Sequence, residues 1–583
     1  MKSRSELIAL APLLVLAGAV ALAACGSGDI AATSLPQATP PAGLVQTVAS
    51  TPTPDDCVQP ACQDFPLPKT PHAVRLTSPQ WERTIKDLLK LDALPGNSVD
   101  FPSDPVPSAD RFGEEAGDLI VTTQHWAAYQ KAAEALAALV TDDASALDKL
   151  LPAAAKSGDT ATRVSAFVSD FLPRAYRRPV TAKEIADVVA VGEAAAANVS
   201  VGDPFLVRAK WILTAVLQSP KLLYRISLGE EVAKDGRARL TPYEVATKLA
   251  YGLWGTMPDD ALTARVSAGE LNTKEGVATV ARAMLTDPRA TVAMLDFHDQ
   301  LYLVEHYLDV KNRPLDLHPS FYDSMMVDTQ VDIRRTIEEL VVKNDGGFKE
   351  LATSPVAFVN AQLAAVYGVD TSKYPELTSS PNAFTKVSFD PAQRKGILMH
   401  AGWLAFEAAP KDPSPIHRGA FVARHVICAP LGSPPPGAAG AMPDKSPQPT
   451  NRLRVEDTTK GCGDGCHGGK GGVINPLGFS FEGFDSIGQL RTMDGTLPVD
   501  ASGELSLVGK FSGAVALFDT VATNARAHAC YAAHWSSYLN GSSLVDVTPR
   551  WLSPAVAKSL KNGSVRDIVV ELVQTDAFLT VSR

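Results

Sequence analysis

The stretch Thr241-Pro242-Tyr243-Glu244 carries three signals that together begin an α-helix. A threonine at the N-cap accepts a backbone hydrogen bond, a proline suits the first helical position, and a glutamate at the third position bonds back to the cap. The same cap spacing recurs in Thr181-Ala-Lys-Glu184, and Ser78-Pro79 precedes an apolar stripe at helical spacing in residues 80–91. These signals predict a mainly α-helical body from about residue 76 to residue 428.

Further helices are expected on both sides of this stretch. An amphipathic helix is predicted over 319–343, stopped by Asn344-Asp-Gly-Gly, and another from Asn360 to near Gly368. Residues 503–511 carry short β-like runs, and residues 517–582 return to helical patterning. The predicted fold class is therefore mainly α, a multi-segment helical body with a small, loop-rich C-terminal region.

The N-terminus has the pattern of an export signal. Lys2 and Arg4 precede an apolar run over 7–24, which ends in Leu22-Ala-Ala-Cys25. This ending resembles the bacterial lipobox, in which the cysteine becomes the acylated first residue of the mature protein. The alternative is ordinary secretion with cleavage near Ala24. Gly26 is not an inner-membrane retention signal, so we expect a protein anchored through lipid on Cys25 in the outer membrane.

Composition limits the partners of the mature chain. A formal net charge of -10 over 583 residues argues against a nucleic-acid partner. After the signal, no apolar run approaches the roughly 18 residues of a membrane helix, so the body is expected to be soluble and tethered. Residues 26–71 are rich in Pro, Thr and Ser and predict a flexible tether, and a second Pro-rich linker is predicted at 429–452.

The most specific chemical signal is Cys462-Gly-Asp-Gly-Cys466-His467. Two cysteines followed by a histidine attach a c-type haem: the thiols add to the vinyl groups, and the imidazole binds the iron. The usual spacing is C-x-x-C-H, and this chain has one more residue between the cysteines. The alternatives are a Cys462–Cys466 disulfide, a metal site that lacks a fourth ligand, and a loop without a role. Haem c is the predicted cofactor.

The sequence does not specify the second axial ligand of such a haem. Met493 is the nearest methionine after His467, and a Met/His pair would raise the haem potential. His417 and an open, five-coordinate iron are the alternatives.

The remaining cysteines of this exported chain predict disulfides. Cys57, Cys62, Cys428 and Cys530 allow three connectivities, of which Cys57–Cys62 with Cys428–Cys530 is the simplest.

An ordered series of motifs resembles a known family. The series is Asp170-Phe-Leu-Pro-Arg-Ala-Tyr-Arg-Arg-Pro179, Ser219-Pro-Lys-Leu-Leu-Tyr-Arg225, Leu249-Ala-Tyr-Gly-Leu-Trp-Gly-Thr-Met-Pro-Asp259, Ser414-Pro-Ile-His-Arg-Gly419 and Asn475-Pro-Leu-Gly-Phe-Ser-Phe-Glu-Gly-Phe-Asp485. It resembles large exported bacterial proteins built from consecutive domains of unknown function, many with a cytochrome-c-like C-x-x-C-H before the last motif. The resemblance covers roughly residues 76–580 and implies no particular reaction.

These patterns divide the chain into predicted segments. They are a signal peptide (1–25), the tether (26–71), an N-terminal helical domain (72–160), a helical domain with the Arg-Arg-Pro motif (161–235), a large helical domain (236–375), a helical segment with Ser-Pro-Ile-His-Arg-Gly (376–428), the linker (429–452), a cytochrome-c-like region (453–500) and a C-terminal helical domain (501–583).

Three weaker constellations have a structural and a functional interpretation. His298 and His306, with Glu305 adding an oxygen, could hold a metal from one helix face, or they pack in a core. Asp259-Asp260 could work as acid and base, but caps the next helix on the simpler interpretation. Three arginines bind an anion or bridge helices and carboxylates: Arg174, Arg177 and Arg178.

No serine-hydrolase elbow, zincin motif or dinucleotide fingerprint occurs, so the sequence indicates no catalytic set. Two hypotheses follow. The first is a lipid-anchored electron-transfer protein with a C-terminal haem region and a redox partner. The second is a haem-free surface protein that binds a polymer or a partner and has a Cys462–Cys466 disulfide.

Overall fold

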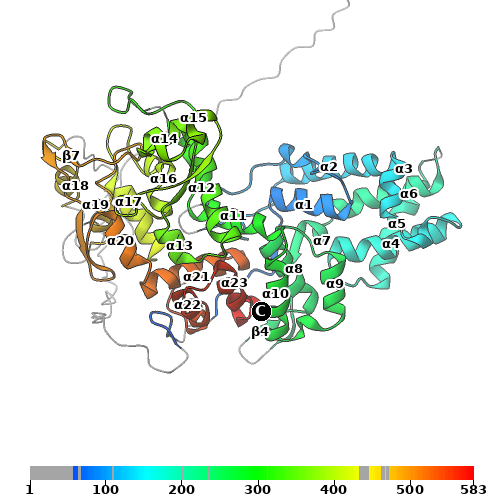
Figure 1. The fold of residues 1–583 in the computed structure, drawn as a ribbon. Coiled ribbons are helices and arrows are strands. Elements are labelled where there is room, and N and C mark those ends of the chain that lie inside the picture. Colours follow the sequence, from blue (N-terminus) through cyan, green and yellow to red (C-terminus); the bar gives the residue numbers. More distant parts are fainter. Residues whose placement is uncertain are drawn as a thin grey trace, which may run out of the picture. The chain divides into compact units, whose positions relative to one another are not determined.

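Helices make up most of the chain in the computed structural model, which confirms the predicted mainly α class (Figure 1). The structure describes residues 57–63, 67–107, 111–199, 201–232, 236–311, 313–431, 446–460, 467, 472–545 and 547–582, all within one unit that spans 54–583. The export signal, Cys25 and most of the tether lie outside these residues. Among the described residues, no helix has both the length and the apolar character needed to cross a membrane.

The N-terminal half contains the following elements: β1 (Ala73–Arg75), α1 (Ser78–Leu88), α2 (Thr123–Thr141), α3 (Ala144–Leu150), α4 (Thr160–Tyr176), α5 (Ala182–Ala196), α6 (Pro204–Leu217), α7 (Pro220–Leu223), β2 (Tyr224–Ile226), β3 (Glu230–Val232), β4 (Arg237–Arg239), α8 (Pro242–Trp254), α9 (Asp260–Ser267), α10 (Lys274–Leu285) and α11 (Ala290–Leu301).

The C-terminal half continues with α12 (Met325–Ile337), α13 (Phe348–Thr353), β5 (Val356–Val359), α14 (Ala361–Tyr367), α15 (Glu376–Ser379), β6 (Thr385–Ser388), α16 (Ala401–Phe406), α17 (Pro415–Phe421), α18 (Asn451–Thr459), α19 (Ile474–Phe479), β7 (Met493–Asp494), β8 (Leu497–Pro498), β9 (Ser502–Leu505), β10 (Gly509–Ser512), α20 (Gly513–Val521), α21 (Ala525–Asn540), α22 (Ser553–Leu560), α23 (Val565–Val573), α24 (Asp576–Leu579) and β11 (Thr580–Ser582).

The buried apolar residues form two cores, and α8 contributes to both. Tyr251 belongs to the core of the N-terminal helices, whereas Leu249 and Leu253 belong to the larger core of the rest of the unit. The predicted capping box begins this helix: the Thr241 side chain accepts from the Glu244 amide at 3.2 Å, and the Glu244 carboxylate accepts from the Thr241 amide at 2.7 Å. The beginning of α8 is therefore fixed locally, and the helix connects the two cores.

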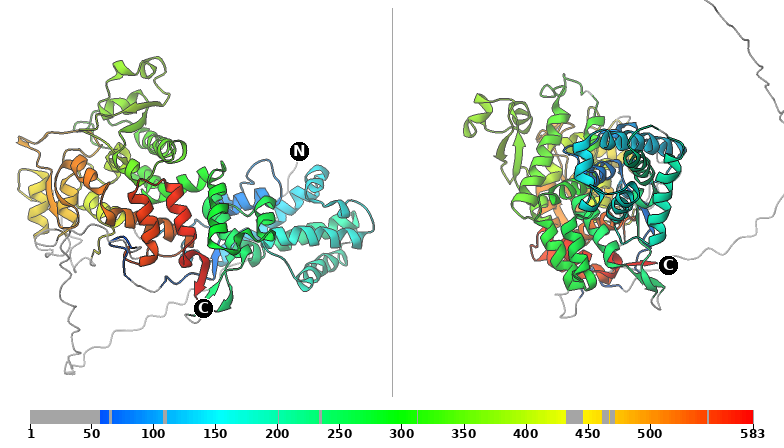
Figure 2. Two further views of the ribbon diagram at one scale, coloured as in Figure 1. Left: turned by 60° about the horizontal axis from the view of Figure 1, so that its bottom comes forward. Right: turned by 90° about the vertical axis from the view of Figure 1, so that its right-hand side faces the viewer.

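The sheets are small and antiparallel. Among the described strands, the largest sheet has the order β11-β4-β3, so the chain's C-terminal strand pairs with a strand more than 300 positions earlier (Figure 2). The β-like runs predicted in 503–511 form the hairpin β9–β10.

One predicted helix begins later than expected. The pattern over 319–343 predicts a single helix, but α12 begins at Met325, and a π-helical turn over Glu338–Lys343 completes the segment. The first residues of the interval are turns and irregular backbone, where the Tyr322 hydroxyl donates to Asp328 at 3.0 Å.

Two disulfides join the cysteines in the simplest of the three connectivities. Cys57 pairs with Cys62, and Cys428 pairs with Cys530, with Cα atoms 5.3 and 5.4 Å apart. Cys530 lies within α21, which continues to Asn540.

Candidate functional site

Two of the family-like motifs meet at a close helix crossing. The helix α17 carries Ser-Pro-Ile-His-Arg-Gly, and α19 carries Asn-Pro-Leu-Gly-Phe. A Cβ on Gly419 would lie 1.9 Å from the Ile474 carbonyl oxygen, and one on Gly478 would lie 1.8 Å from the Pro415 oxygen. Only glycine fits at these two points, because any side chain would push the helices apart.

Arg418 fixes the turn that follows α19. Its side chain is fully buried, and its guanidinium donates to the carbonyl oxygens of Phe481 (3.1 Å), Phe484 (3.1 Å), Asp485 (2.8 Å) and Leu404 (2.8 Å). Burial lowers the pKa of Arg418 to about 9, so the side chain is still charged at neutral pH. A single charged group of the first motif therefore satisfies three backbone acceptors of the second motif and one, Leu404, of α16.

Glu482 is the buried carboxylate of this region. Its oxygens accept from the Asn451 amide at 2.9 Å and from Arg491 at 2.8 Å. Burial raises the pKa of Glu482, and the nearby charge of Arg491 opposes that rise. The side chain thus connects the beginning of α18 to the segment after α19.

His467, the candidate iron ligand, is held by Asn475. The ring Nδ1 lies 3.2 Å from Asn475 Oδ1, and the Asn475 amide donates to the His467 carbonyl oxygen at 3.1 Å. Asn475 is itself anchored, because its side-chain nitrogen donates to Thr459 Oγ1 at 2.8 Å. In the tautomer that satisfies this contact, Nδ1 donates and Nε2 keeps a lone pair, which is the form that ligates a metal.

The two cysteines of the motif cannot be placed. Cys462 and Cys466 lie outside the described residues, so haem attachment and the alternative disulfide both stay predictions. Phe481, which follows the motif, has its ring centroid 5.1 Å from that of Trp403, inside the larger core.

The candidates for a second axial ligand differ in their placement. Met493 lies on β7 with 47% of its surface exposed, and no contact to His467 is present among the described residues. His417 is about 200° around α17 from both Pro415 and Gly419, the residues that face α19. The geometry therefore turns His417 away from α19, and Met493 stays a prediction.

The two histidines considered as a metal pair do not share a helix face. His298 is buried in α11, where Nε2 lies 2.8 Å from the Tyr531 hydroxyl. Leu303, with φ of 53°, separates that helix from His306, which pairs with Asp309 at 2.9 Å. Glu305 pairs with Arg334 instead. The structure therefore supports the interpretation in which these histidines have structural partners and do not form a metal site.

Asp259 and the arginine cluster have structural partners. Asp259 caps α9 by accepting from the Leu262 amide at 2.8 Å. Arg178 pairs with Glu184 at 2.7 Å, and Arg174 pairs with Asp170 at 2.9 Å.

Arg177 connects three of the family-like motifs. It donates to the Tyr224 carbonyl oxygen at 2.7 Å and to the Tyr251 hydroxyl at 3.3 Å. The motifs that contain Arg177, Arg225 and Tyr251 are thus in contact, as the bridging interpretation of the cluster predicts.

A buried acidic network was not predicted. Asp332, which is 0% exposed, accepts from the Tyr367 hydroxyl at 2.6 Å and lies 2.8 Å from His400 Nδ1. No sequence motif marks these residues, because they come together only in the fold. A geometric Cys428–Cys530–His534 group also exists, but its sulfur atoms are joined in the disulfide.

The family comparisons agree with the order of the motifs. Four models match, each described as a protein of unknown function: PSD3 (DUF1587) over residues 75–142, PSD5 (DUF1595) over 163–227, PSD4 (DUF1592) over 240–369 and PSCyt3 (DUF1588) over 394–494. No curated protein and no solved structure matches the chain. The PSCyt3 match contains α17, α19 and His467. The chain therefore belongs to the family of proteins built from these consecutive domains of unknown function, with a cytochrome c-like domain near the C-terminal end.

Proposed function

We propose that this protein is an exported, lipid-anchored electron-transfer protein that binds one c-type haem through Cys462, Cys466 and His467. The supporting observation is the contact between His467 Nδ1 and Asn475 Oδ1, inside the cytochrome c-like match. A histidine that ligates a metal commonly donates a hydrogen bond from its other ring N–H to such an acceptor.

His467 and its hydrogen-bond partner Asn475 fit the role of an axial haem ligand and the residue that orients it. The thiols of Cys462 and Cys466 would form the thioether bonds, and His467 Nε2 would be the axial ligand. When bound, a c-type haem supplies a one-electron iron couple. The role of Asn475 is to hold the imidazole in one orientation and one tautomer. Arg418 and the glycine crossing keep α19, and with it Asn475, in place.

The anchor and the partner complete the proposal. Acyl chains on Cys25 would hold the protein at the outer membrane, facing the periplasm or the cell surface. Electrons would pass to or from a redox partner that docks on the exported body. In the haem-free alternative, the same body binds a surface polymer or a partner, and Cys462 and Cys466 bond to each other.

Haem binding is tested by producing the exported protein with a c-haem maturation system. We expect a Soret band, a haem stain that survives denaturing electrophoresis, and a pyridine haemochrome with one haem per chain. Cys466→Ala should abolish covalent haem, and His467→Ala should remove the axial imidazole and shift the Soret band. His306→Ala, which changes an imidazole far along the sequence, is the matched control and should leave the spectrum unchanged. A Cys462–Cys466 disulfide in the peptide map together with no Soret band would reject the haem proposal.

The anchor is tested separately. Mass spectrometry of the N-terminal peptide should find acyl chains on Cys25, and Cys25→Ala should release the protein from the membrane fraction. An unmodified Cys25 would reject the anchor but would leave the haem proposal standing.

A further inference from the structure

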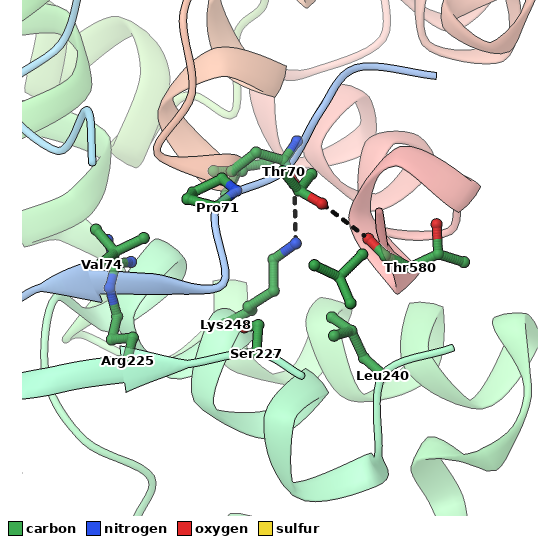
Figure 3. A pocket seen from close by; sticks show the side chains of 11 residues that line it. Thr70, Pro71, Val74, Arg225, Ser227, Leu240, Lys248 and Thr580 are labelled. Atoms are coloured by element: carbon green, nitrogen blue, oxygen red, sulfur yellow. Dashed lines mark hydrogen bonds between the residues drawn. The ribbon is translucent and has the colours of Figure 1, made fainter. Parts of the chain in front are cut away.

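The C-terminal end of α21 leaves no room for an organic ligand. The cavity there, lined by Asn540, Lys248 and Thr70 among others, has a volume of about 20 Å³, which one water-sized species fills (Figure 3). Every residue of the helix from Ala527 to Asn540 is buried. Any chemistry of this helix beyond packing therefore comes from its own side chains and their neighbours.

Two tyrosines of α21 hold their hydroxyl groups against a base. The Tyr531 hydroxyl lies 2.8 Å from His298 Nε2, and the Tyr538 hydroxyl donates to Asp296 at 2.7 Å. His298 Nδ1 lies 2.6 Å from the Met294 carbonyl oxygen, which can only accept, so Nδ1 carries the proton and Nε2 accepts from Tyr531. Burial lowers the pKa of His298 to about 4, so its ring is neutral at neutral pH. Each phenol thus has a proton acceptor within hydrogen-bond reach.

An indole lies between these tyrosines on the same helix face. Trp535 is one helical turn from each of them and is 1% exposed. Its ring centroid is 5.8 Å from that of Tyr538 and 3.7 Å from that of Phe297, whose ring lies 5.9 Å from Tyr531. These are the distances of aromatic rings in contact. Tryptophan and tyrosine lose an electron most readily among aromatic side chains, so the cluster can share one oxidising equivalent.

A continuous series of ring contacts connects this cluster to the cytochrome c-like match. Successive ring centroids are 4.1 to 6.0 Å apart, and all the rings are buried. In order, the rings are Phe481, Trp403, Phe421, His425, His534, Phe112 and Tyr538. The rings from Phe481 to His425 lie within the matched residues 394–494. The series is therefore a route by which an electron can leave the α21 tyrosines for an oxidant in that region.

Trp403, the oxidisable ring at the far end of this series, has no base. Its side chain is 0% exposed, and Nε1 has no hydrogen-bond partner among the described residues. An oxidised Trp403 would keep its proton, because a buried N–H without an acceptor cannot release it, and would stay a strong oxidant. The oxidising equivalent is therefore more stable on a tyrosine that gives its proton to a base.

We propose that Tyr531 and Tyr538 are redox-active and receive oxidising equivalents from the cytochrome c-like region through this series of rings. The inference rests on the proposed electron-transfer function for the origin of the oxidant, not for the chemistry of the tyrosines. In the step, one electron leaves the phenol for a one-electron oxidant, and the O–H bond breaks. The proton moves to His298 Nε2 or to the Asp296 carboxylate, which leaves a neutral tyrosyl radical beside an imidazolium or a carboxylic acid.

Photochemically generated ruthenium(III) tris-bipyridine is a suitable probe, because this one-electron oxidant needs no haem. The full chain, made with and without haem maturation, is oxidised, held until radicals on exposed residues have decayed, and frozen for electron paramagnetic resonance. We expect a persistent tyrosyl radical in both preparations, since buried phenoxyls cannot couple with each other. Ring-deuterated tyrosine should collapse its hyperfine structure. A missing Soret band would reject the haem proposal and leave this result standing.

The variants decide where the radical lies. Tyr531→Phe/Tyr538→Phe keeps both rings and should abolish the persistent signal. Tyr307→Phe is the matched control and should leave the signal unchanged, because Tyr307 is also 0% exposed but its hydroxyl has no partner among the described residues. The absence of a persistent tyrosyl radical in wild type, or the same signal in the double variant, would overturn the proposal. In haem-loaded protein oxidised with hydrogen peroxide, Trp403→Phe should lower the radical yield, and an unchanged yield would overturn the route through the rings.

Discussion

Removing the Cys428–Cys530 disulfide should destabilise the protein much more than removing Cys57–Cys62. The first bond joins residues 102 positions apart, and the second joins residues 5 positions apart. Cross-linking restricts the unfolded chain, and the chain-entropy relation gives about 4.7 kcal/mol for the long loop and about 2 kcal/mol for the short one. The long loop also encloses α18, α19 and the haem-like motif.

The assay is urea unfolding of Cys428→Ala/Cys530→Ala, with Cys57→Ala/Cys62→Ala as the matched control. We expect the free energy of unfolding to fall by about 2.7 kcal/mol more in the first double variant than in the second. Tryptophan fluorescence reports the transition, and Trp535 is buried in the same helix as Cys530. Equal losses in the two double variants would show that the unfolded chain is not what the long-range bond restricts.

Three further changes test the packing and the buried charge. Gly478→Ala should cost about 3 kcal/mol by urea unfolding and reduce haem yield, because the new Cβ would lie 1.8 Å from the Pro415 oxygen. Arg418→Met should cost on the order of 4 kcal/mol or more, measured in the same way, because buried carbonyl oxygens lose their donor. The pKa of Glu114 is raised from 4.5 to about 8 by burial, so its contribution is full below pH 4.5 and is lost as the pH rises toward 8. Glu114→Gln should flatten the fall in unfolding midpoint between pH 5 and pH 8, whereas the exposed control Glu134→Gln should not; an unchanged slope in Glu114→Gln would contradict the assignment.

Helix beginnings could be predicted because their signals are local. The Thr181 and Thr241 capping boxes, and the Asn360 cap with Gly368 in the left-handed conformation, all occur where the sequence indicates them. Each depends on residues within one turn of the helix end. The late start of α12 at Met325 was missed, because an apolar stripe does not reveal a turn that precedes it.

The contacts that could not be predicted join residues far apart in the sequence. Arg418 is recognisable as part of a motif, yet its acceptors at Phe481 and Phe484 are 63 and 66 positions away. His400 and Asp332 are 68 positions apart and share no pattern. Cysteine pairing was the exception, since few cysteines leave few connectivities.

The contacts of His467 indicate which part of haem attachment the extra residue between Cys462 and Cys466 affects. Asn475 and α19 orient this histidine from its C-terminal side, through contacts that do not involve the cysteines. In this sequence Cys466 keeps its usual place directly before the histidine, and the extra residue falls between the cysteines. The insertion therefore changes the reach of Cys462 and leaves the relation of Cys466 to the axial ligand intact. On this reasoning the insertion weighs against one thioether bond, not against the histidine ligand or the second thioether, and Cys466 is the thiol on which covalent attachment depends.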